Sequence, residues 1–195
     1  MSEKGYHVAV VGATGAVGQK IIELLEKETK FNIAEVTLLS SKRSAGKTVK
    51  FKGQEITIQE AKINSFEGID IALFSAGGEV SKQFVNQAAK SGAIVIDNTS
   101  EYRMTQNVPL VVPEVNTHTL KEHKGIIANP NCSTIQMVTA LQPIRKQYGL
   151  KRIIVSTYQA VSGAGTQAIQ EIKEQAKAIL KWRRSEEYYI TSEKR

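Results

Sequence analysis

Short apolar runs alternate with amphipathic stretches over residues 1–130, and this alternation limits the possible folds more than any other feature of the chain. The runs predict buried strands over residues 6–11, 36–39, 69–74, 94–96, 110–112 and 126–128. Helices are predicted between them over residues 17–25 and 80–90, because apolar residues recur there at helical spacing. Strands that are apolar on both faces and joined by helices form parallel sheets covered on both sides. We therefore predict an α/β fold with a doubly wound, mainly parallel sheet.

Further elements are predicted from turn residues and apolar periodicity. They are a hairpin over residues 47–51 and 55–58, a helix over 132–148, a strand over 153–157 and a helix over 166–180. Lys52 and Gly53 form the hairpin turn, and Gly149 can end the helix before it. Residues 181–195 differ in composition, since they hold the only tryptophan and show no clear amphipathic pattern.

Composition excludes several classes of protein. Of the 195 residues, 41% are hydrophobic and 23% charged, which is ordinary for a globular domain. No apolar run approaches membrane-spanning length, and the first residues lack the hydrophobic region of a signal peptide. A single cysteine excludes an internal disulfide and a cysteine-rich metal site, so we expect a cytoplasmic protein without a metal site. Part of the net charge of +7 lies in residues 181–195 and the rest is scattered, which argues against a nucleic-acid partner and suits an anionic small molecule at least as well. No membrane partner is expected.

Three glycines with the spacing G-x-x-G-x-x-G stand between the first predicted strand and the first predicted helix: Gly12, Gly15 and Gly18. Glycine permits a tight turn and lets the backbone approach a pyrophosphate, whose charge then lies at the helix N-terminus. The alternative is a structural turn that binds nothing. Because this turn follows a strand and opens a helix at the start of an alternating fold, it favours a Rossmann-like, dinucleotide-binding domain.

The end of the second strand indicates which dinucleotide binds. An NAD site normally has an acidic residue there, which holds the ribose 2′-hydroxyl. Here the strand is followed by Ser40, Ser41, Lys42, Arg43 and Ser44. Two cations and three hydroxyls suit a 2′-phosphate, so the sequence favours NADP. The alternative is a solvated basic loop.

The only cysteine, Cys132, stands where a helix is predicted to begin, directly after Pro130 and Asn131. A thiol at a helix N-terminus meets the positive end of the helix dipole and free N–H groups, which favour the thiolate. Cys132 is therefore a candidate nucleophile, and the alternative is a small buried apolar residue. Small or polar residues also end two strands, at 75–78 and 97–100, where a ligand can enter the crevice of a parallel sheet.

Several longer motifs occur in order along the chain. They are GATGAVG at 12–18, SSKRSAGK at 40–47, ALFSAGG at 72–78, IVIDNTSEYRM at 94–104, PLVVPEVN at 109–116, ANPNCSTIQM at 128–137 and VSTYQAVSGAG at 155–165. Together they resemble the N-terminal portion of the bacterial, NADP-dependent aspartate-semialdehyde dehydrogenase family, over residues 6 to 180. The resemblance implies an NADP-binding domain over residues 1–130 and the beginning of an α+β catalytic and dimerisation domain, incomplete here, over 131–180. Residues 181–195 are then an atypical tail.

The resemblance also implies a role for individual residues. Cys132 matches the family nucleophile, which forms a thioester with the aspartyl group, and Gln159 would orient the substrate. Arg103 would bind the phosphate of the acyl phosphate, and Asn131 would hold substrate beside the thiol. The positions that match cofactor contacts are Gly12, Thr14, Gly15, Ala16, Val17, Ser41, Arg43, Ser44, Ser75, Ala76, Gly77, Ser162 and Gly163.

The implied reaction is the NADP-dependent reductive dephosphorylation of L-aspartyl 4-phosphate to L-aspartate 4-semialdehyde, carried out by a homodimer. His7, His118 and His123 match no catalytic histidine of the family, and the arginine that grips the substrate carboxylate also comes from a later segment than this chain covers. We therefore expect weak or no activity from these residues alone. A truncated, inactive NADP-binding fragment and the related N-acetyl-gamma-glutamyl-phosphate reductase are the alternatives.

The tail suggests a hypothesis about the gene. A permitted codon set for residues 181–195, read one nucleotide later, encodes Asn-Gly-Glu-Glu-Val-Lys-Asn-Thr-Ile-Leu-Pro-Val-Lys-Lys. This peptide resembles the natural continuation of the family after a helix that ends near Leu180. A single-nucleotide insertion near that codon, or a sequencing error, would explain the unusual composition.

Overall fold

The structure is a computed structural model that describes residues 5–192. The chain divides into two compact units, Met1–Val155 and Ser156–Arg195, which are taken separately below. Within the described residues, none of the helices combines the length and the apolar composition needed to cross a bilayer.

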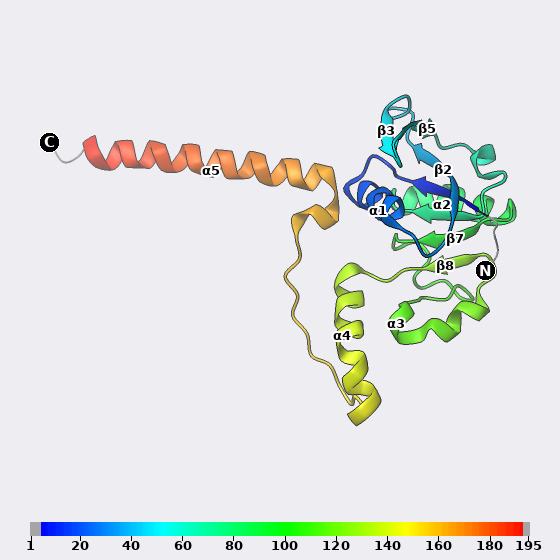
Figure 1. Ribbon diagram of the computed structural model, residues 1–195. Coiled ribbons are helices and arrows are strands. Elements are labelled where there is room, and N and C mark those ends of the chain that lie inside the picture. Colours follow the sequence, from blue (N-terminus) through cyan, green and yellow to red (C-terminus); the bar gives the residue numbers. More distant parts are fainter. Residues whose placement is uncertain (1–4, 193–195) are drawn as a thin grey trace. The chain divides into compact units, whose positions relative to one another are not determined.

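The first unit is built on a parallel sheet of six strands, in the order β5-β2-β1-β6-β7-β8 (Figure 1). Its strands are β1 (Tyr6–Val11), β2 (Ile33–Ser40), β5 (Gln59–Glu60), β6 (Ile71–Phe74), β7 (Ile94–Asp97) and β8 (Ile126–Ala128). The chain moves outward from β1 through β2 on one side and from β6 through β7 on the other. The predicted doubly wound fold is therefore confirmed, and the strand order reverses between β1 and β6.

Both faces of this sheet are buried, which explains why its strands read as continuous apolar runs. On one face, Val8 and Val10 of β1 pack in a cluster with Ile22 of α1 (Ala16–Lys27). On the other face, Ala9 and Val11 pack in a second cluster with the buried side chains of α2 (Gly78–Lys90). Because successive side chains of a strand point to opposite faces, the two helices cover opposite sides of the sheet.

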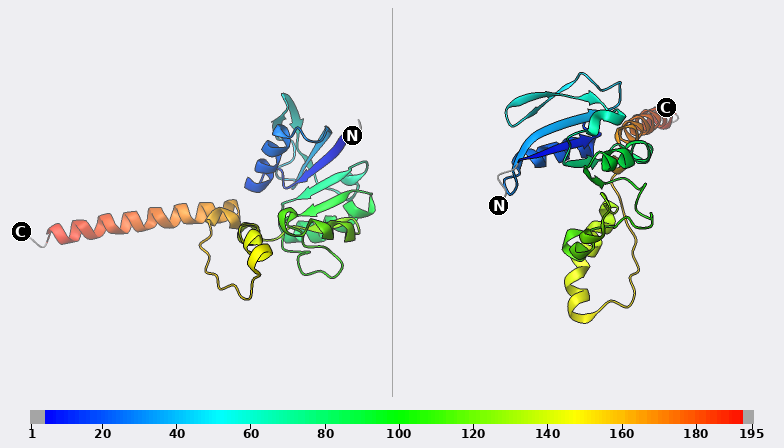
Figure 2. Two further views of the ribbon diagram at one scale, coloured as in Figure 1. Left: turned by 60° about the horizontal axis from the view of Figure 1, so that its bottom comes forward. Right: turned by 90° about the vertical axis from the view of Figure 1, so that its right-hand side faces the viewer.

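The predicted hairpin is confirmed as β3 (Thr48–Phe51) and β4 (Gln54–Thr57), which pair antiparallel. Lys52 and Gly53 form its turn with φ of 46° and 83°, a conformation that glycine adopts freely. Phe51 is buried and joins the cluster under α1. Figure 2 shows the hairpin, in cyan, beside β2. A 3₁₀ turn, η1 (Ile63–Phe66), then leads into β6.

The strand predicted over residues 110–112 is wrong. Leu110 forms a single parallel bridge with Ala128, and the helix α3 (Pro113–Asn116) begins directly after this segment. The side chain of Asn116 accepts a hydrogen bond from Val112 N and donates one to Leu110 O. These backbone groups are thereby satisfied without a second partner strand.

The first unit ends with η2 (Thr117–Glu122), β8 and the helix α4 (Cys132–Tyr148). The predicted limits of this helix are confirmed, including its end at Gly149, whose φ is 73° and whose N–H bonds to Arg145 O.

The second unit contains η3 (Val161–Ala164) and α5 (Thr166–Ser192). The strand predicted over residues 153–157 is wrong, because this segment is extended but pairs with no strand among the described residues, and Ile154 is 82% exposed. An apolar run becomes a strand only where a neighbouring strand satisfies its backbone groups. The predicted helix end near Leu180 is also wrong, since α5 continues to Ser192. Residues 193–195 of the predicted tail lie outside the described residues.

Candidate active site

The predicted site residues of the first unit lie in the segments that follow five parallel strands. The glycine turn follows β1, and the segment with Ser41, Arg43 and Ser44 follows β2. The remaining segments follow β6, β7 and β8 and carry Ser75 to Gly77, Arg103, and Asn131 with Cys132. Since the carboxyl ends of parallel strands meet at one edge of a sheet, these segments share that edge. The strand order reverses between β1 and β6, and in folds of this kind ligands usually bind at the carboxyl ends of the strands beside such a reversal.

The glycine turn is shaped so that only glycine fits at two of its positions. Gly12 has a φ of 92°, and a Cβ there would lie 3.0 Å from the backbone of Ala76. A Cβ on Gly18 would lie 2.1 Å from Gly12 O, so α1 packs directly on the turn. Gly15 is the N-cap of α1 and offers no side-chain oxygen to the first N–H groups of the helix. These N–H groups remain available to a phosphate, and the turn fits a pyrophosphate.

The segment after β2 presents a cation next to the glycine turn. Ser41 and Arg43 are exposed, whereas Ser44 is buried and donates its N–H to Ser41 O over 2.9 Å. Arg43 forms no ion pair with any residue that the structure describes. Thr14 Oγ1 lies 3.0 Å from Ser40 Oγ and so links the glycine turn to this segment. The guanidinium of Arg43 and the hydroxyl groups of Ser41 and Ser44 are donors of the kind that bind a 2′-phosphate.

The segment after β6 contacts the glycine turn. Ser75 donates from both its N–H and its hydroxyl to Val11 O, at 2.9 and 3.1 Å. Gly77 has a φ of 95° and is the N-cap of α2. This segment therefore lies directly against the glycine turn at Gly12.

Arg103 is held against the segment that precedes Cys132. Its Nε donates to Asn129 O over 2.9 Å and its Nη2 donates to Asn98 O over 3.0 Å. Asn129 Nδ2 also donates to Asn98 Oδ1, over 2.7 Å. Among the described residues no carboxylate pairs with Arg103, and its Nη1 makes no hydrogen bond. The guanidinium thus keeps both its charge and a pair of N–H donors for an anion.

Cys132 is the first residue of α4 and is exposed, so the alternative of a buried apolar residue is wrong. Asn131 is the N-cap, and its Oδ1 accepts a hydrogen bond from Ser133 N over 3.0 Å. Its Nδ2 makes no hydrogen bond to another described residue. The cap holds the thiol at the positive end of the helix and leaves an amide donor beside it.

The other predicted site residues belong to the second unit. Gln159 lies in the exposed segment before η3, where its Nε2 lies 3.5 Å from Thr157 Oγ1. Ser162 and Gly163 are exposed residues of η3 itself. Their roles stay predictions.

Two pairs of residues at the carboxyl end of the parallel sheet were not among the predicted site residues. One is the amide pair of Asn98 and Asn129, and the other is the buried pair of Asp97 and Ser81, whose side chains are 2.9 Å apart. The position of Asp97 as the last residue of a buried strand was the available signal. Ser81 and Asn129 lie far from Asp97 and Asn98 in the sequence, so the spacing of residues along the chain could not predict that they bond to each other.

Comparisons with known proteins agree with this arrangement. The model of the semialdehyde dehydrogenase NAD-binding domain matches residues 7–123, and that of the semialdehyde dehydrogenase dimerisation domain matches residues 141–193. Aspartate-semialdehyde dehydrogenase of Bacillus subtilis is 66% identical over 177 residues, which are 91% of this chain and 51% of that protein.

Solved structures are similar as well. Aspartate-semialdehyde dehydrogenase II of Vibrio cholerae, complexed with ASA, has a TM-score of 0.86 and 46% identity over 92% of this chain and 54% of its own. Aspartate-semialdehyde dehydrogenase of Candida albicans, solved with NADP, has a TM-score of 0.62 and 30% identity over 74% of this chain and 48% of its own. The chain spans about half the length of the relatives that it matches.

Proposed function

Because this chain belongs to the semialdehyde dehydrogenase family, we propose that it carries the cofactor-binding region and the nucleophile of an aspartate-semialdehyde dehydrogenase. The reaction is the NADP-dependent reductive dephosphorylation of L-aspartyl 4-phosphate to L-aspartate 4-semialdehyde, a step toward lysine, threonine and methionine. One observation carries the proposal. Arg103, a cation without a carboxylate partner among the described residues, bonds to Asn129, three residues before the exposed Cys132.

The first chemical step uses residues of the first unit. The Cys132 thiolate attacks the carbonyl carbon of the acyl phosphate, a thioester forms, and inorganic phosphate leaves with the bonding electron pair. Arg103 stabilises the leaving phosphate through the N–H groups of Nη1. Asn131 Nδ2 donates to the carbonyl oxygen on which negative charge develops.

The glycine turn and the segment after β2 would hold the cofactor. When bound, NADPH would supply the hydride that reduces the thioester. The first N–H groups of α1 would bind the pyrophosphate, and Arg43 with Ser41 and Ser44 would bind the 2′-phosphate. The exposed position of Arg43 and its lack of an ion-pair partner within residues 5–192 support the choice of NADP over NAD.

Calorimetric titration of the purified chain with NADP and NAD tests the cofactor. We expect NADP to bind at least about tenfold more tightly, because charge-assisted bonds to the 2′-phosphate are lost with NAD. Arg43→Ala should remove this preference and leave NAD affinity unchanged. The neighbouring Lys42→Ala is the matched control and should have a smaller effect. Tighter binding of NAD by the unmodified chain would overturn the assignment.

Turnover of aspartate semialdehyde with NADP and phosphate tests the reaction. We expect weak or no turnover, because no histidine of this chain matches the catalytic histidine of the family. Mass spectrometry after exposure to substrate, with Cys132→Ser as control, should detect any acyl group on Cys132. Substantial turnover, or acylation that survives Cys132→Ser, would contradict this account.

The partners and the compartment are part of the proposal. We propose a homodimer, which the match of residues 141–193 to a dimerisation domain supports, and light scattering tests it. We further propose a cytoplasmic location, because an exposed lone thiol that acts as a nucleophile must stay reduced.

The domain boundaries at residues 130 and 180 and the shifted reading frame of the tail remain proposals too. The coding DNA tests the frame, since codons incompatible with the shifted peptide would refute it.

A further inference from the structure

Asp97 carries a buried carboxylate and is hydrogen-bonded to α2, to the segment after β7 and to the segment after β8. It is the last residue of β7 and is 0% exposed. One carboxylate oxygen accepts from Ser81 Oγ over 2.9 Å and from Thr99 N over 3.0 Å, and the other accepts from Thr99 Oγ1 over 2.8 Å. Ser81, on α2, is also 0% exposed. Burying a carboxylate costs free energy unless donors surround it, so the three donors offset this cost and hold α2 and the segment after β7 in place around Asp97.

Asp97 is linked to both segments that carry the predicted chemistry. Its backbone oxygen accepts from Asn129 N over 2.8 Å, on the segment that leads to Cys132. Its carboxylate binds Thr99, next to Asn98, whose backbone oxygen accepts from Arg103. Arg103 in turn donates to Asn129 O. These hydrogen bonds join Asp97 to the segment after β7 and to the segment after β8, and Arg103 joins the two segments to each other.

We propose that Asp97 is a positioning residue for phosphate binding, an inference that rests on the proposed function: through Thr99 and Ser81 it holds the segment that aims Arg103 at an anion beside Cys132. The ligand class is inorganic phosphate or an acyl phosphate.

A set of conservative variants separates positioning from packing. Thr99→Val removes the hydroxyl that donates to Asp97 and keeps the branched shape, whereas Thr99→Ser keeps the hydroxyl. Asp97→Asn keeps the shape and replaces one acceptor by a donor. Thr37→Val is the matched control, because Thr37 Oγ1 bonds to His7 Nε2 and not to these segments.

The test is an NMR titration of the ¹⁵N-labelled chain with inorganic phosphate, in which the Arg103 Nε–H signal is followed. We expect a saturable shift, and about a tenfold weaker phosphate affinity in Asp97→Asn and Thr99→Val, since a charge-assisted bond is lost. Thr99→Ser and Thr37→Val should stay within about twofold of the unmodified chain. The affinity for NADP should also stay within about twofold in every variant, because a general loss of structure would lower both affinities.

The outcomes distinguish this inference from the proposed function. An unmodified chain whose Arg103 signal does not respond to phosphate would contradict the role of Arg103, and this inference with it. A response that is unchanged in Asp97→Asn and Thr99→Val would overturn the inference alone. Equal losses of phosphate and NADP affinity would also overturn it, since they indicate a structural role. If Asp97→Asn does not fold, the Thr99→Val and Thr99→Ser pair gives the same decision.

Discussion

The two units of the molecule differ in how their apolar side chains are used. In the first, apolar residues from strands and helices form two buried clusters, one on each face of the sheet. In the second, Ile172, Ile179 and Leu180 of α5 are exposed, with Ile179 at 59% and Leu180 at 62%. Both units contain helices, because helical hydrogen bonds join residues four positions apart, whereas a buried core requires partners from distant segments.

The difference bears on function. The site segments of the first unit extend from a sheet that is packed on both faces, which gives their residues definite partners. The residues of the second unit that we propose as ligand contacts, Gln159, Ser162 and Gly163, lie in an exposed segment. Rigid support is what a catalytic arrangement needs, and it is found here in the first unit.

The largest expected effect compares a core side chain with an exposed one. Phe74 is 0% exposed and stacks on Phe66 with ring centroids 5.8 Å apart. Phe74→Ala should lower the free energy of unfolding by about 3–5 kcal/mol, and Ile179→Ala by less than about 0.5 kcal/mol. Urea denaturation measures both. A large loss in Ile179→Ala would mean that α5 is buried against a partner in solution.

The next effect compares two glycines. In Gly18→Ala the new methyl group would meet the backbone of Gly12, at 2.1 Å from its oxygen, and we expect a loss of about 1–3 kcal/mol with weaker NADP binding. In Gly163→Ala nothing lies within 4 Å, and the change should be neutral or stabilise by up to about 1 kcal/mol. Thermal denaturation measures the stability of both variants, and NADP titration measures their cofactor affinity. Equal effects in Gly18→Ala and Gly163→Ala would contradict the prediction.

A smaller effect concerns the cap of α4. Asn131→Ala removes the side chain that accepts from Ser133 N, and we expect a loss of about 1 kcal/mol. Asn131→Asp keeps an acceptor and should retain most of the stability, as urea denaturation can measure. If Asn131→Ala and Asn131→Asp were equally destabilised, the loss of the capping hydrogen bond would not explain the lower stability.

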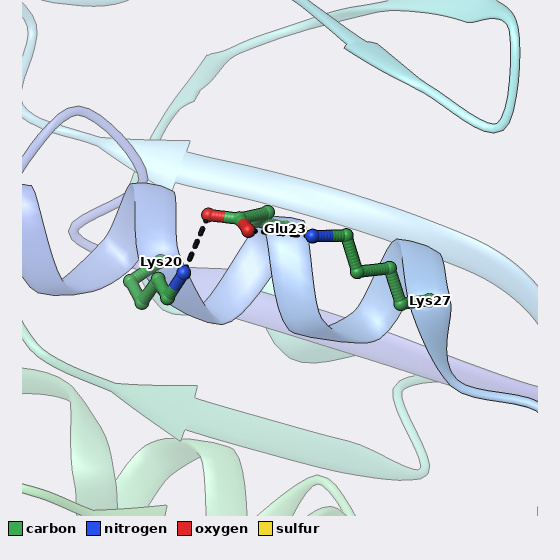
Figure 3. Close-up of polar contacts among 3 residues, drawn as sticks. All are labelled: Lys20, Glu23 and Lys27. Atoms are coloured by element: carbon green, nitrogen blue, oxygen red, sulfur yellow. Dashed lines mark hydrogen bonds and ion pairs between the residues drawn. The ribbon is translucent and has the colours of Figure 1, made fainter.

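The smallest effect is an exposed charge cluster on α1. Lys20 Nζ and Lys27 Nζ lie 2.8 and 2.7 Å from the carboxylate of Glu23 and lower its pKa to about 2 (Figure 3). Because the folded-state pKa lies below the unfolded value, this stabilisation is present above about pH 4.3 and is lost as the pH falls toward 2. Glu23→Gln should therefore shift the melting temperature by only about 1 °C at pH 7.

Salt supplies the control for this prediction. The difference between Glu23→Gln and the unmodified chain should shrink in about 1 M NaCl, where exposed charges are screened, and at pH 2, where Glu23 is half protonated. A difference that persists in high salt would point to a packing role for the side chain.

Much of the fold was predictable because burial leaves a pattern in sequence. The limits of β1 and α4 agree with prediction, and the glycine turn, the hairpin turn at Lys52 and the helix start at Cys132 follow from local backbone rules. The two strands that were wrongly predicted, at residues 110–112 and 153–157, are apolar runs that find no full partner strand. An apolar run shows that a segment can be buried and does not show what will pair with it.

The sequence by itself determined the succession of strands and helices along the chain, the turn after β1 and the start of α4 at Cys132, because each depends on residues within a few positions of one another. Only the tertiary structure decided that Arg103 bonds to Asn129, 26 positions along the chain, and that Ser81 closes on Asp97. The physical reason is that such bonds depend on which strand ends become neighbours in the sheet. That choice is made by the packing of the whole unit.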